Sequence, residues 1–310
     1  MFLIDLVKSM QASQVVVIGA GPAGLATALQ LKRQGIEVLL LEGGRVGGLL
    51  HNANLVENYP GFPGGLPGPK LVALFAEQAH QVGVEITRET VATLHRETDY
   101  FHIETRDNSY LASIVVVATG TKPKTFTDIV IPENLLGQVF YEVYPLLGVE
   151  GKRIAIIGAG DAAFDYALNL SDKNEVLILN RGVDISCLPL LHERVQENPS
   201  IQYFELTRVL TLEETPQSMI RLLCEGSKGE ISFEVNDMIG AIGRVPRLDF
   251  IADTLQKQIS QLETDSLLHF VGDVKNGRYR QTAIAVGDGI RAAMKIEQRL
   301  KNLSSLEHTL

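Results

Sequence analysis

The sequence predicts an α/β fold with two Rossmann-like, three-layer nucleotide-binding domains, the second inserted into the first. Residues 15–42 read VVVIGAGPAGLATALQLKRQGIEVLLLE, a pattern of buried strand, glycine turn, helix and second strand. The same order recurs in residues 153–180, RIAIIGAGDAAFDYALNLSDKNEVLILN. Since each glycine turn between a strand and a helix is typical of a dinucleotide site, two bound nucleotides are indicated.

The segments around these two units have weaker but readable patterns. A Pro/Gly-rich loop at 58–69 precedes an expected helix at 70–81, and alternation near 100–105 predicts hairpin strands. The remaining expected elements are a strand at 114–118, β-like segments at 201–212, 219–224 and 231–233, a strand at 269–273 and a final helix near 282–301. We therefore expect the first domain at residues 1–123 and 247–310, and the inserted domain at 124–246.

Composition limits the kinds of partner. The formal charge of −9 over 310 residues opposes binding to nucleic acid or to an anionic membrane, because both would be repelled. No apolar run reaches the ~20 residues of a membrane span, and Asp5 before Lys8 is unlike a secretory signal. With only two cysteines, Cys187 and Cys224, a reducing and cytoplasmic location is expected. The seven histidines show no metal-ligand spacing, so no metal is expected.

The first glycine turn has the full context of a dinucleotide fingerprint. It reads Gly19-Ala20-Gly21-Pro22-Ala23-Gly24, between the strand and the helix. In such a turn the first glycine allows a tight bend, the second lets the backbone approach a pyrophosphate, and the helix N-terminus supplies amide donors. Glu42 ends the second strand, where it is placed to accept a hydrogen bond from a ribose hydroxyl.

Further motifs follow along the chain: GGLL at 47–50, VENYPG at 56–61, ATG at 118–120, GD at 272–273 and RQ at 280–281. In this order they resemble the landmarks of low-molecular-weight thioredoxin reductases, and the resemblance covers nearly the whole chain. The resemblance implies an FAD site in the first domain, with Leu49 and Asn58 along the flavin and Thr119 near the adenosine. The implied FAD residues beyond the glycine turn are Glu42, Gly43, Gly47, Gly48, Leu49, Leu50, Asn58, Val91, Ala118, Thr119, Gly120, Gly272, Asp273, Arg280, Gln281 and Thr282.

The chain departs from that family at its redox centre. Thioredoxin reductases carry Cys-x-x-Cys-Asp before the second glycine turn, and these positions here read Tyr141-Glu-Val-Tyr144-Pro145. Because thiol exchange needs one thiolate to attack and a second thiol to resolve, the usual internal relay is not expected. Tyr141 and Tyr144 are candidates to cover the flavin ring by stacking; the alternative is that both simply pack in the linker between domains.

The second glycine turn leaves its ligand open. It reads Gly158-Ala159-Gly160-Asp161-Ala162-Ala163, and the next strand ends at Asn180-Arg181. NAD sites usually have an acid at that strand end and NADP sites an arginine. Of the family's arginine cluster only Arg181 remains, so NADPH, NADH, a second FAD or no ligand are all open. Gly243 and Arg244 resemble the family's contact beside the nicotinamide, where Arg244 is either a phosphate clamp or a surface residue.

These observations favour an FAD-dependent oxidoreductase without a dithiol, which passes electrons from NAD(P)H to an external acceptor. It resembles the ferredoxin/flavodoxin-NADP reductases of thioredoxin-reductase type, which implies a ferredoxin or flavodoxin as acceptor; a small molecule is the alternative. Two other hypotheses are an electron-transfer flavoprotein with a different nucleotide, such as a second FAD, in the second site, and a non-enzymatic flavin sensor. The resemblance implies a homodimer. Because the chain has a net negative charge, it would attract an acidic ferredoxin only at a local patch of basic residues.

Overall fold

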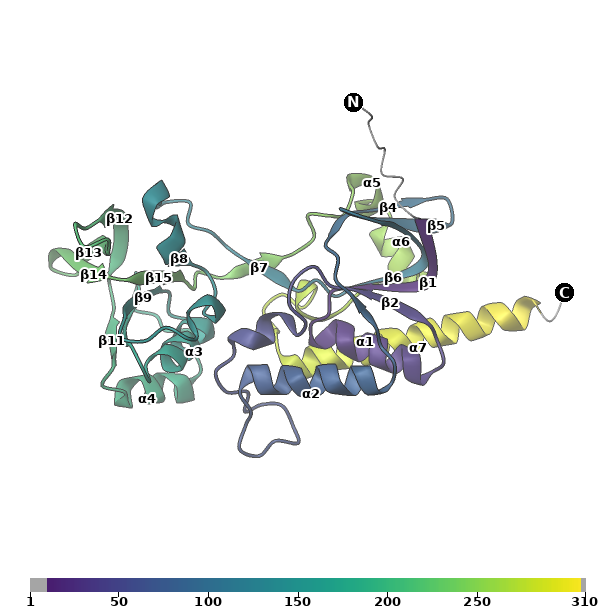
Figure 1. The fold of residues 1–310 in the computed structure, drawn as a ribbon, viewed down its shortest axis with the longest axis horizontal. Helices are drawn as coiled ribbons and strands as arrows, with labels where there is room; N and C mark the ends of the chain where they lie inside the picture. The colour runs from purple at the N-terminus through teal and green to yellow at the C-terminus, as the bar shows by residue number, and fades with distance from the viewer. Residues whose placement is uncertain (1–9, 308–310) are drawn as a thin grey trace, which may run out of the picture. The chain divides into compact units, whose positions relative to one another are not determined.

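The structure is a computed structural model that describes residues 10–307 (Figure 1). The chain forms two compact units. Of the described residues, the first unit holds 10–51, 57–122 and 246–307, and the second holds 52–56 and 123–245. The predicted α/β fold with two Rossmann-like units is confirmed. Asp5 and Lys8, the residues that are unlike a secretory signal, lie outside the described residues.

The first unit is built on a seven-stranded sheet. Its order is β3-β2-β1-β6-β5-β4, with β17 also paired to β6. The β1, β2, β3, β6 and β17 strands pair in parallel, while β4 and β5 form the predicted hairpin and continue antiparallel to β6. The strands are β1 (Met10–Ile18), β2 (Val38–Leu41), β3 (Ile86–Thr87), β4 (Val91–Glu97), β5 (Tyr100–Thr105), β6 (Ser109–Val117) and β17 (Leu268–Phe270).

Side chains of β1 point alternately to the two faces of the sheet, and each face is covered by a different layer of the unit. Val15 and Val17 pack with the helices α1 (Pro22–Arg33), α2 (Gly68–Gln81) and α7 (Thr282–Glu307). Val16 and Ile18 point to the opposite face, because successive side chains of a strand alternate. There they meet β4, β5 and the short helices α5 (Asp253–Gln256) and α6 (Ile259–Thr264). Figure 1 shows α1, α2 and α7 together on one side of the sheet.

The second unit repeats the Rossmann pattern on a smaller scale. Its five strands run in the order β11-β10-β9-β15-β8, all parallel. One face packs against α3 (Asp161–Leu170) and α4 (Pro189–Glu197), and the other against a three-stranded antiparallel sheet. The strands are β8 (Val139–Phe140), β9 (Arg153–Ile157), β10 (Glu175–Leu179), β11 (Ile201–Phe204) and β15 (Asp237–Gly240), with β12 (Arg208–Glu214), β13 (Ile220–Gly226) and β14 (Gly229–Val235) in the antiparallel sheet.

Short elements join these parts. The two stretches of chain that run between the units pair with each other as β7 (Thr121–Pro123) and β16 (Arg244–Pro246). Four 3₁₀ turns occur in the described residues: η1 (Gly48–Asn52), η2 (Glu133–Gln138), η3 (Tyr144–Leu146) and η4 (Gly272–Val274). Among residues 10–307, no helix is long and apolar enough to cross a membrane.

Some element boundaries differ from those expected. The segment at 201–212 divides into β11 and β12, because Leu206 adopts a left-handed conformation with φ of 48° and interrupts the strand. The strand expected at 269–273 ends at Phe270 and η4 follows. The helix expected at 70–81 begins two residues earlier, with Pro69 in its first turn. The final helix continues six residues beyond 301, to Glu307.

Candidate cofactor sites

The first glycine turn passes close to the backbone that follows β6. Gly19 has a φ of +104°, and a Cβ built on it would lie 2.5 Å from the backbone oxygen of Ala118. A side chain is therefore excluded both by conformation and by space. α1 begins three residues later with Pro22 in its first turn, where a missing N–H costs no hydrogen bond.

The other two glycines of the turn differ in what surrounds them. A Cβ on Gly24 would lie 1.8 Å from the Gly19 oxygen, so Gly24 allows the helix to pack on the turn. A Cβ on Gly21 would meet no heavy atom within 4 Å. No side chain caps the N-terminus of α1. The amides of the first turn of α1 thus face an open space. The positive end of the helix dipole points to the same space, so a pyrophosphate would be favoured there.

Glu42 stands at the mouth of this turn. One carboxylate oxygen accepts a hydrogen bond from the Ala20 amide at 2.6 Å, and the other accepts from the Gly44 amide at 2.7 Å. The Gly47 amide donates to the Ala20 oxygen at 2.7 Å, which brings the 47–50 motif against the same turn. The acid predicted to contact a ribose is therefore held beside the predicted pyrophosphate position by backbone donors.

The landmarks near the C-terminus contact earlier motifs of the chain. A Cβ on Gly272 would be 2.8 Å from the Ala23 Cβ, so η4 packs closely on the first turn of α1. The Asn58 amide donates to the Gln281 side-chain oxygen at 2.6 Å, although 223 positions separate them. Between these contacts, the buried Nε of Arg280 has no hydrogen-bond partner. The fold thus brings together motifs that the sequence relates only by their order.

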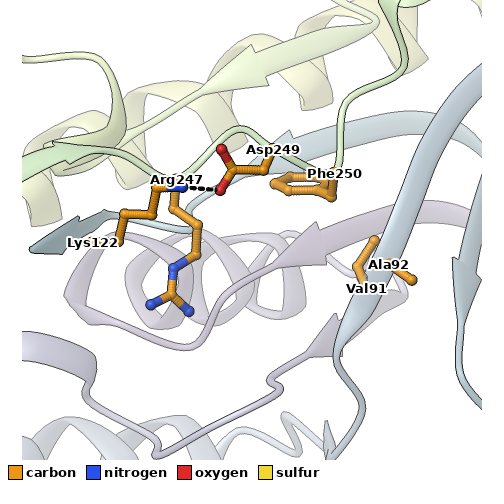
Figure 2. Close-up of a pocket in the computed structure, with 6 residues that line it drawn as sticks. All are labelled: Val91, Ala92, Lys122, Arg247, Asp249 and Phe250. Carbon is orange, nitrogen blue, oxygen red and sulfur yellow. Dashed lines mark hydrogen bonds and ion pairs between the residues drawn. The ribbon is translucent and has the colours of Figure 1, made fainter. Parts of the chain in front are cut away.

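A pocket of about 380 Å³ lies beside β4 in the first unit (Figure 2). It is lined by Val91, Ala92, Lys122, Arg247, Asp249 and Phe250. Lys122 forms an ion pair with Asp249, and the Arg247 guanidinium extends away from that pair. The Arg247 oxygen accepts a hydrogen bond from the Thr119 hydroxyl at 2.7 Å. The pocket therefore adjoins two predicted positions, Val91 and Thr119.

The second glycine turn has the same strand–turn–helix form with a different neighbour. Gly158 has a φ of +140°, and a Cβ on it would lie 2.4 Å from the Ala241 oxygen. The Ser186 amide donates to the Ala159 oxygen at 2.9 Å. Asp161, the first residue of α3, accepts from the Leu188 amide at 2.7 Å. The segment after β10 is thus anchored across this turn.

At the end of β10, the Asn180 side chain bonds to the following loop and to β11. Its side-chain amide donates to the Asp184 oxygen at 3.0 Å and to the Tyr203 hydroxyl at 2.9 Å. Its side-chain oxygen accepts from the Gly182 amide at 3.2 Å. Arg181 is exposed and forms no ion pair within the described residues. Of the two predicted strand-end residues, Arg181 alone presents its side chain to solvent.

The two tyrosines at the cysteine positions make contacts within the second unit. The Tyr141 hydroxyl accepts a hydrogen bond from the Phe126 amide at 3.2 Å. Its ring would be 2.9 Å from a Cβ on Gly240, so it packs against that backbone. The Tyr144 amide donates to the Asn52 side-chain oxygen at 3.0 Å. Packing accounts for these contacts, and a role beside the flavin stays a prediction.

Two acids that sequence reasoning missed lie in the same unit. Glu142 forms an ion pair with Arg244 at 2.9 Å, so the candidate phosphate clamp already has an anionic partner. Asp165 accepts a hydrogen bond from the Asn54 amide at 3.0 Å. Burial raises the pKa of Asp165 to about 6, with a smaller contribution from the charge of Asp161. No motif marked either acid, because their partners are 102 and 111 positions away.

Neither cysteine is suited to thiol exchange. Both are free, and Cys224 is buried while Cys187 is partly buried. Burial raises the pKa of Cys224 to about 11 and also raises that of Cys187. Since the thiolate is the nucleophile, a raised pKa lowers reactivity at neutral pH. Within residues 10–307, no group of three or more His, Cys, Asp or Glu side chains is arranged to hold a metal ion.

Two Rossmann units in one chain, each with a glycine turn at the carboxyl end of its first strand, define an α/β protein of the two-dinucleotide oxidoreductase class. Residues 13–289 match the pyridine nucleotide-disulphide oxidoreductase family. The chain belongs to this family, and it is a flavin-dependent oxidoreductase with the fold of the low-molecular-weight thioredoxin reductases.

Relatives and solved structures agree on that fold. The thioredoxin reductase of Borreliella burgdorferi is 26% identical, with 96% of this chain and 98% of that protein aligned. The thioredoxin reductase of Lactococcus lactis, solved in its FR conformation, is 25% identical with a TM-score of 0.82 and covers 94% of this chain and 99% of its own. The T. acidophilum thioredoxin reductase is also 25% identical, with a TM-score of 0.80. The match covers 93% of this chain and 98% of that chain.

Proposed function

We propose that this chain is an NAD(P)H-dependent FAD oxidoreductase that passes electrons directly to an external acceptor, without a dithiol relay. The observation that carries the proposal is the first glycine turn. There, the open face at Gly21, the uncapped N-terminus of α1 and the carboxylate of Glu42 converge on one position. Amide donors for a pyrophosphate beside an acceptor for a ribose are what an adenine dinucleotide needs.

Other residues of the first unit fit the remaining parts of FAD. The pocket beside Val91 and Thr119 is proposed to receive the adenosine half, as the family resemblance implies. The Asn58–Gln281 contact and the unpartnered Nε of Arg280 favour the flavin at those residues. A buried guanidinium N–H without an acceptor is costly, and a carbonyl of the flavin ring would satisfy it.

The second unit is proposed to bind the nicotinamide coenzyme at its own glycine turn, between Gly158 and Ala163. With the Asn180 side chain occupied by the following loop and by Tyr203, Arg181 is the side chain available to recognise a 2′-phosphate. The end of β10 carries no acid for the 2′-hydroxyl of NADH. When bound, FAD would supply the hydride-accepting and electron-releasing chemistry, while the residues of the two glycine turns would hold and orient the two nucleotides.

The acceptor is proposed to be a ferredoxin, a flavodoxin or a small molecule rather than a protein disulfide. The relatives are named thioredoxin reductases. However, positions 141 and 144 are tyrosines and both thiols of this chain have raised pKa values. A cytoplasmic homodimer is also proposed, on the strength of the family resemblance.

Cofactor content after purification tests the FAD site. We expect one FAD per chain, released by denaturation and quantified by chromatography and mass spectrometry. Gly21→Val adds a side chain where no protein atom lies within 4 Å, so the apoprotein should fold normally while FAD affinity falls by at least about 100-fold. Gly148→Val, at a position with equally open space in the second unit, is the control and should keep its FAD. Full FAD content in Gly21→Val would contradict the site.

A further inference from the structure

A cluster of unpaired cations stands out in this anionic chain. Lys275, Arg278 and Arg280 fall within six residues, which we call the basic loop (residues 275–280). The sequence holds no Asp or Glu from 274 to 287, although the chain as a whole has nine more acids than bases. Within the described part of the chain, none of the three cations forms an ion pair with a carboxylate.

The basic loop forms a turn from which Lys275, Arg278 and Tyr279 face outward. The Asn276 amide donates to the buried Asp288 carboxylate at 2.6 Å, and the Tyr279 amide donates to the Asn276 oxygen at 2.9 Å, closing a turn. Tyr279 remains 62% exposed, and the Arg278 guanidinium lies 5.2 Å from the centre of its ring. Lys275 and Arg278 are also exposed. An arginine held over an exposed tyrosine is typical of side chains that dominate protein interfaces.

The position of the loop links it to the cofactor site. Its start is fixed by Gly272, which packs on Ala23 in the first turn of α1. Its end is fixed by Gln281, which accepts the hydrogen bond from Asn58. The loop therefore spans two landmarks of the proposed FAD site, and Arg280 has its side-chain Nε buried on the inner side while Lys275 and Arg278 face solvent.

We propose that the basic loop is the docking surface for an acidic electron-carrier protein, which receives electrons at the edge of the flavin. This inference rests on the proposed function, and it selects a protein carrier over a small molecule. Local positive charge steers an acidic partner to this place, while the net negative charge elsewhere disfavours wrong orientations. With a one-electron carrier the reaction balances as NAD(P)H + 2 oxidised carriers → NAD(P)⁺ + H⁺ + 2 reduced carriers.

Charge reversal at the two exposed cations tests the docking surface. The variant Lys275→Glu/Arg278→Glu is compared with Lys228→Glu/Lys257→Glu, which reverses two exposed cations elsewhere. Each protein is reduced with dithionite, freed of excess reductant, and mixed with an acidic ferredoxin, with basic cytochrome c or with uncharged benzoquinone. We expect the loop variant to lose about tenfold or more of its second-order rate with ferredoxin at low salt, and most of its salt dependence.

The other acceptors give the proposal its controls. The loop variant should reduce benzoquinone at the unchanged rate and cytochrome c at an unchanged or higher rate, whereas the control variant should keep the ferredoxin rate. Tyr279→Ala should lower the ferredoxin rate while keeping the salt dependence, because it removes contact area and no charge. An unchanged ferredoxin rate in the loop variant, or an equal loss in the control variant, would overturn the docking surface. Because dithionite supplies the electrons, this outcome is separate from a failure of NAD(P)H to reduce the flavin.

Discussion

At the scale of single residues, the structure separates what local pattern can predict from what only the fold creates. Gly19, Gly21, Gly24 and Glu42 were predictable because the dinucleotide turn depends on spacing within one βαβ unit. The Lys122–Asp249 pair was not, because its members are 127 positions apart and neither belongs to a motif. Asn180 shows that the rule about strand ends has a limit, because its side-chain amide and oxygen already bond to the following loop and to Tyr203 of β11.

Arg181 is expected to set any preference between the two nicotinamide coenzymes. A single exposed guanidinium at the end of β10 favours the doubly charged 2′-phosphate. Arg181→Ala should therefore bring the ratio of kcat/KM for NADPH over NADH to about one, mainly through KM for NADPH. Lys228→Ala, which removes an exposed cation from a distant hairpin, should leave the ratio alone. A preserved ratio in Arg181→Ala would show that the phosphate is recognised elsewhere.

Asp165 makes stability depend on pH. Its pKa is about 6 in the folded protein against the ordinary 3.8, so between these values the folded state binds more protons than the unfolded state. The contribution of Asp165 to the free energy of unfolding is fully present below pH 3.8 and is lost as the pH rises through 6. A shift of about two units corresponds to at most about 3 kcal/mol.

The test of this effect is Asp165→Asn, which removes the charge and keeps an acceptor for the Asn54 amide. We expect the variant to be more stable than the parent by about 1–3 kcal/mol at pH 8, with the difference shrinking steadily toward pH 5. Denaturant unfolding followed across that pH range measures the difference directly. A difference that stays constant with pH would mean that Asp165 titrates normally.

At the scale of elements, the first unit depends on close packing of α7 against α1. A Cβ on Gly289 would lie 2.3 Å from the Ala23 oxygen, whereas a Cβ on Gly287 of the same helix would meet nothing within 4 Å. The sequence predicted both helices. It did not predict this contact, because helical pattern alone does not say which faces of two distant helices meet.

The two glycines of α7 form a matched pair for mutation. Gly287→Ala should stabilise the protein by about 0.5–1 kcal/mol, because alanine has the higher helix propensity. Gly289→Ala should instead destabilise it by about 1–3 kcal/mol and weaken FAD binding, because it pushes against the first turn of α1. Thermal unfolding and FAD release by fluorescence measure the two effects. Equal behaviour of the two variants would show that the helices are not in close contact.

At the scale of the whole molecule, two repeated sequence patterns predicted the fold, since each βαβ unit carries its own signals. Strand lengths and the small sheet of β12, β13 and β14 were less predictable, because single left-handed residues such as Leu206 decide where strands break. We propose that function differs from that of the relatives through a few positions, because Tyr141 and Tyr144 stand where the resemblance places the dithiol. Burial raises the pKa of both cysteines, which lowers their reactivity as thiolates.

The central claim is that electrons pass from NAD(P)H through FAD to an outside acceptor without any thiol. The most direct measurement is anaerobic stopped-flow absorbance of the FAD-loaded double variant Cys187→Ser/Cys224→Ala, mixed with NADPH or NADH and then with ferredoxin or with oxidised thioredoxin. We predict prompt bleaching of the flavin at the parent rate, reoxidation by ferredoxin and no reduction of thioredoxin. A flavin that neither coenzyme bleaches, or a thioredoxin reduction that the parent performs and the double variant has lost, would contradict the account.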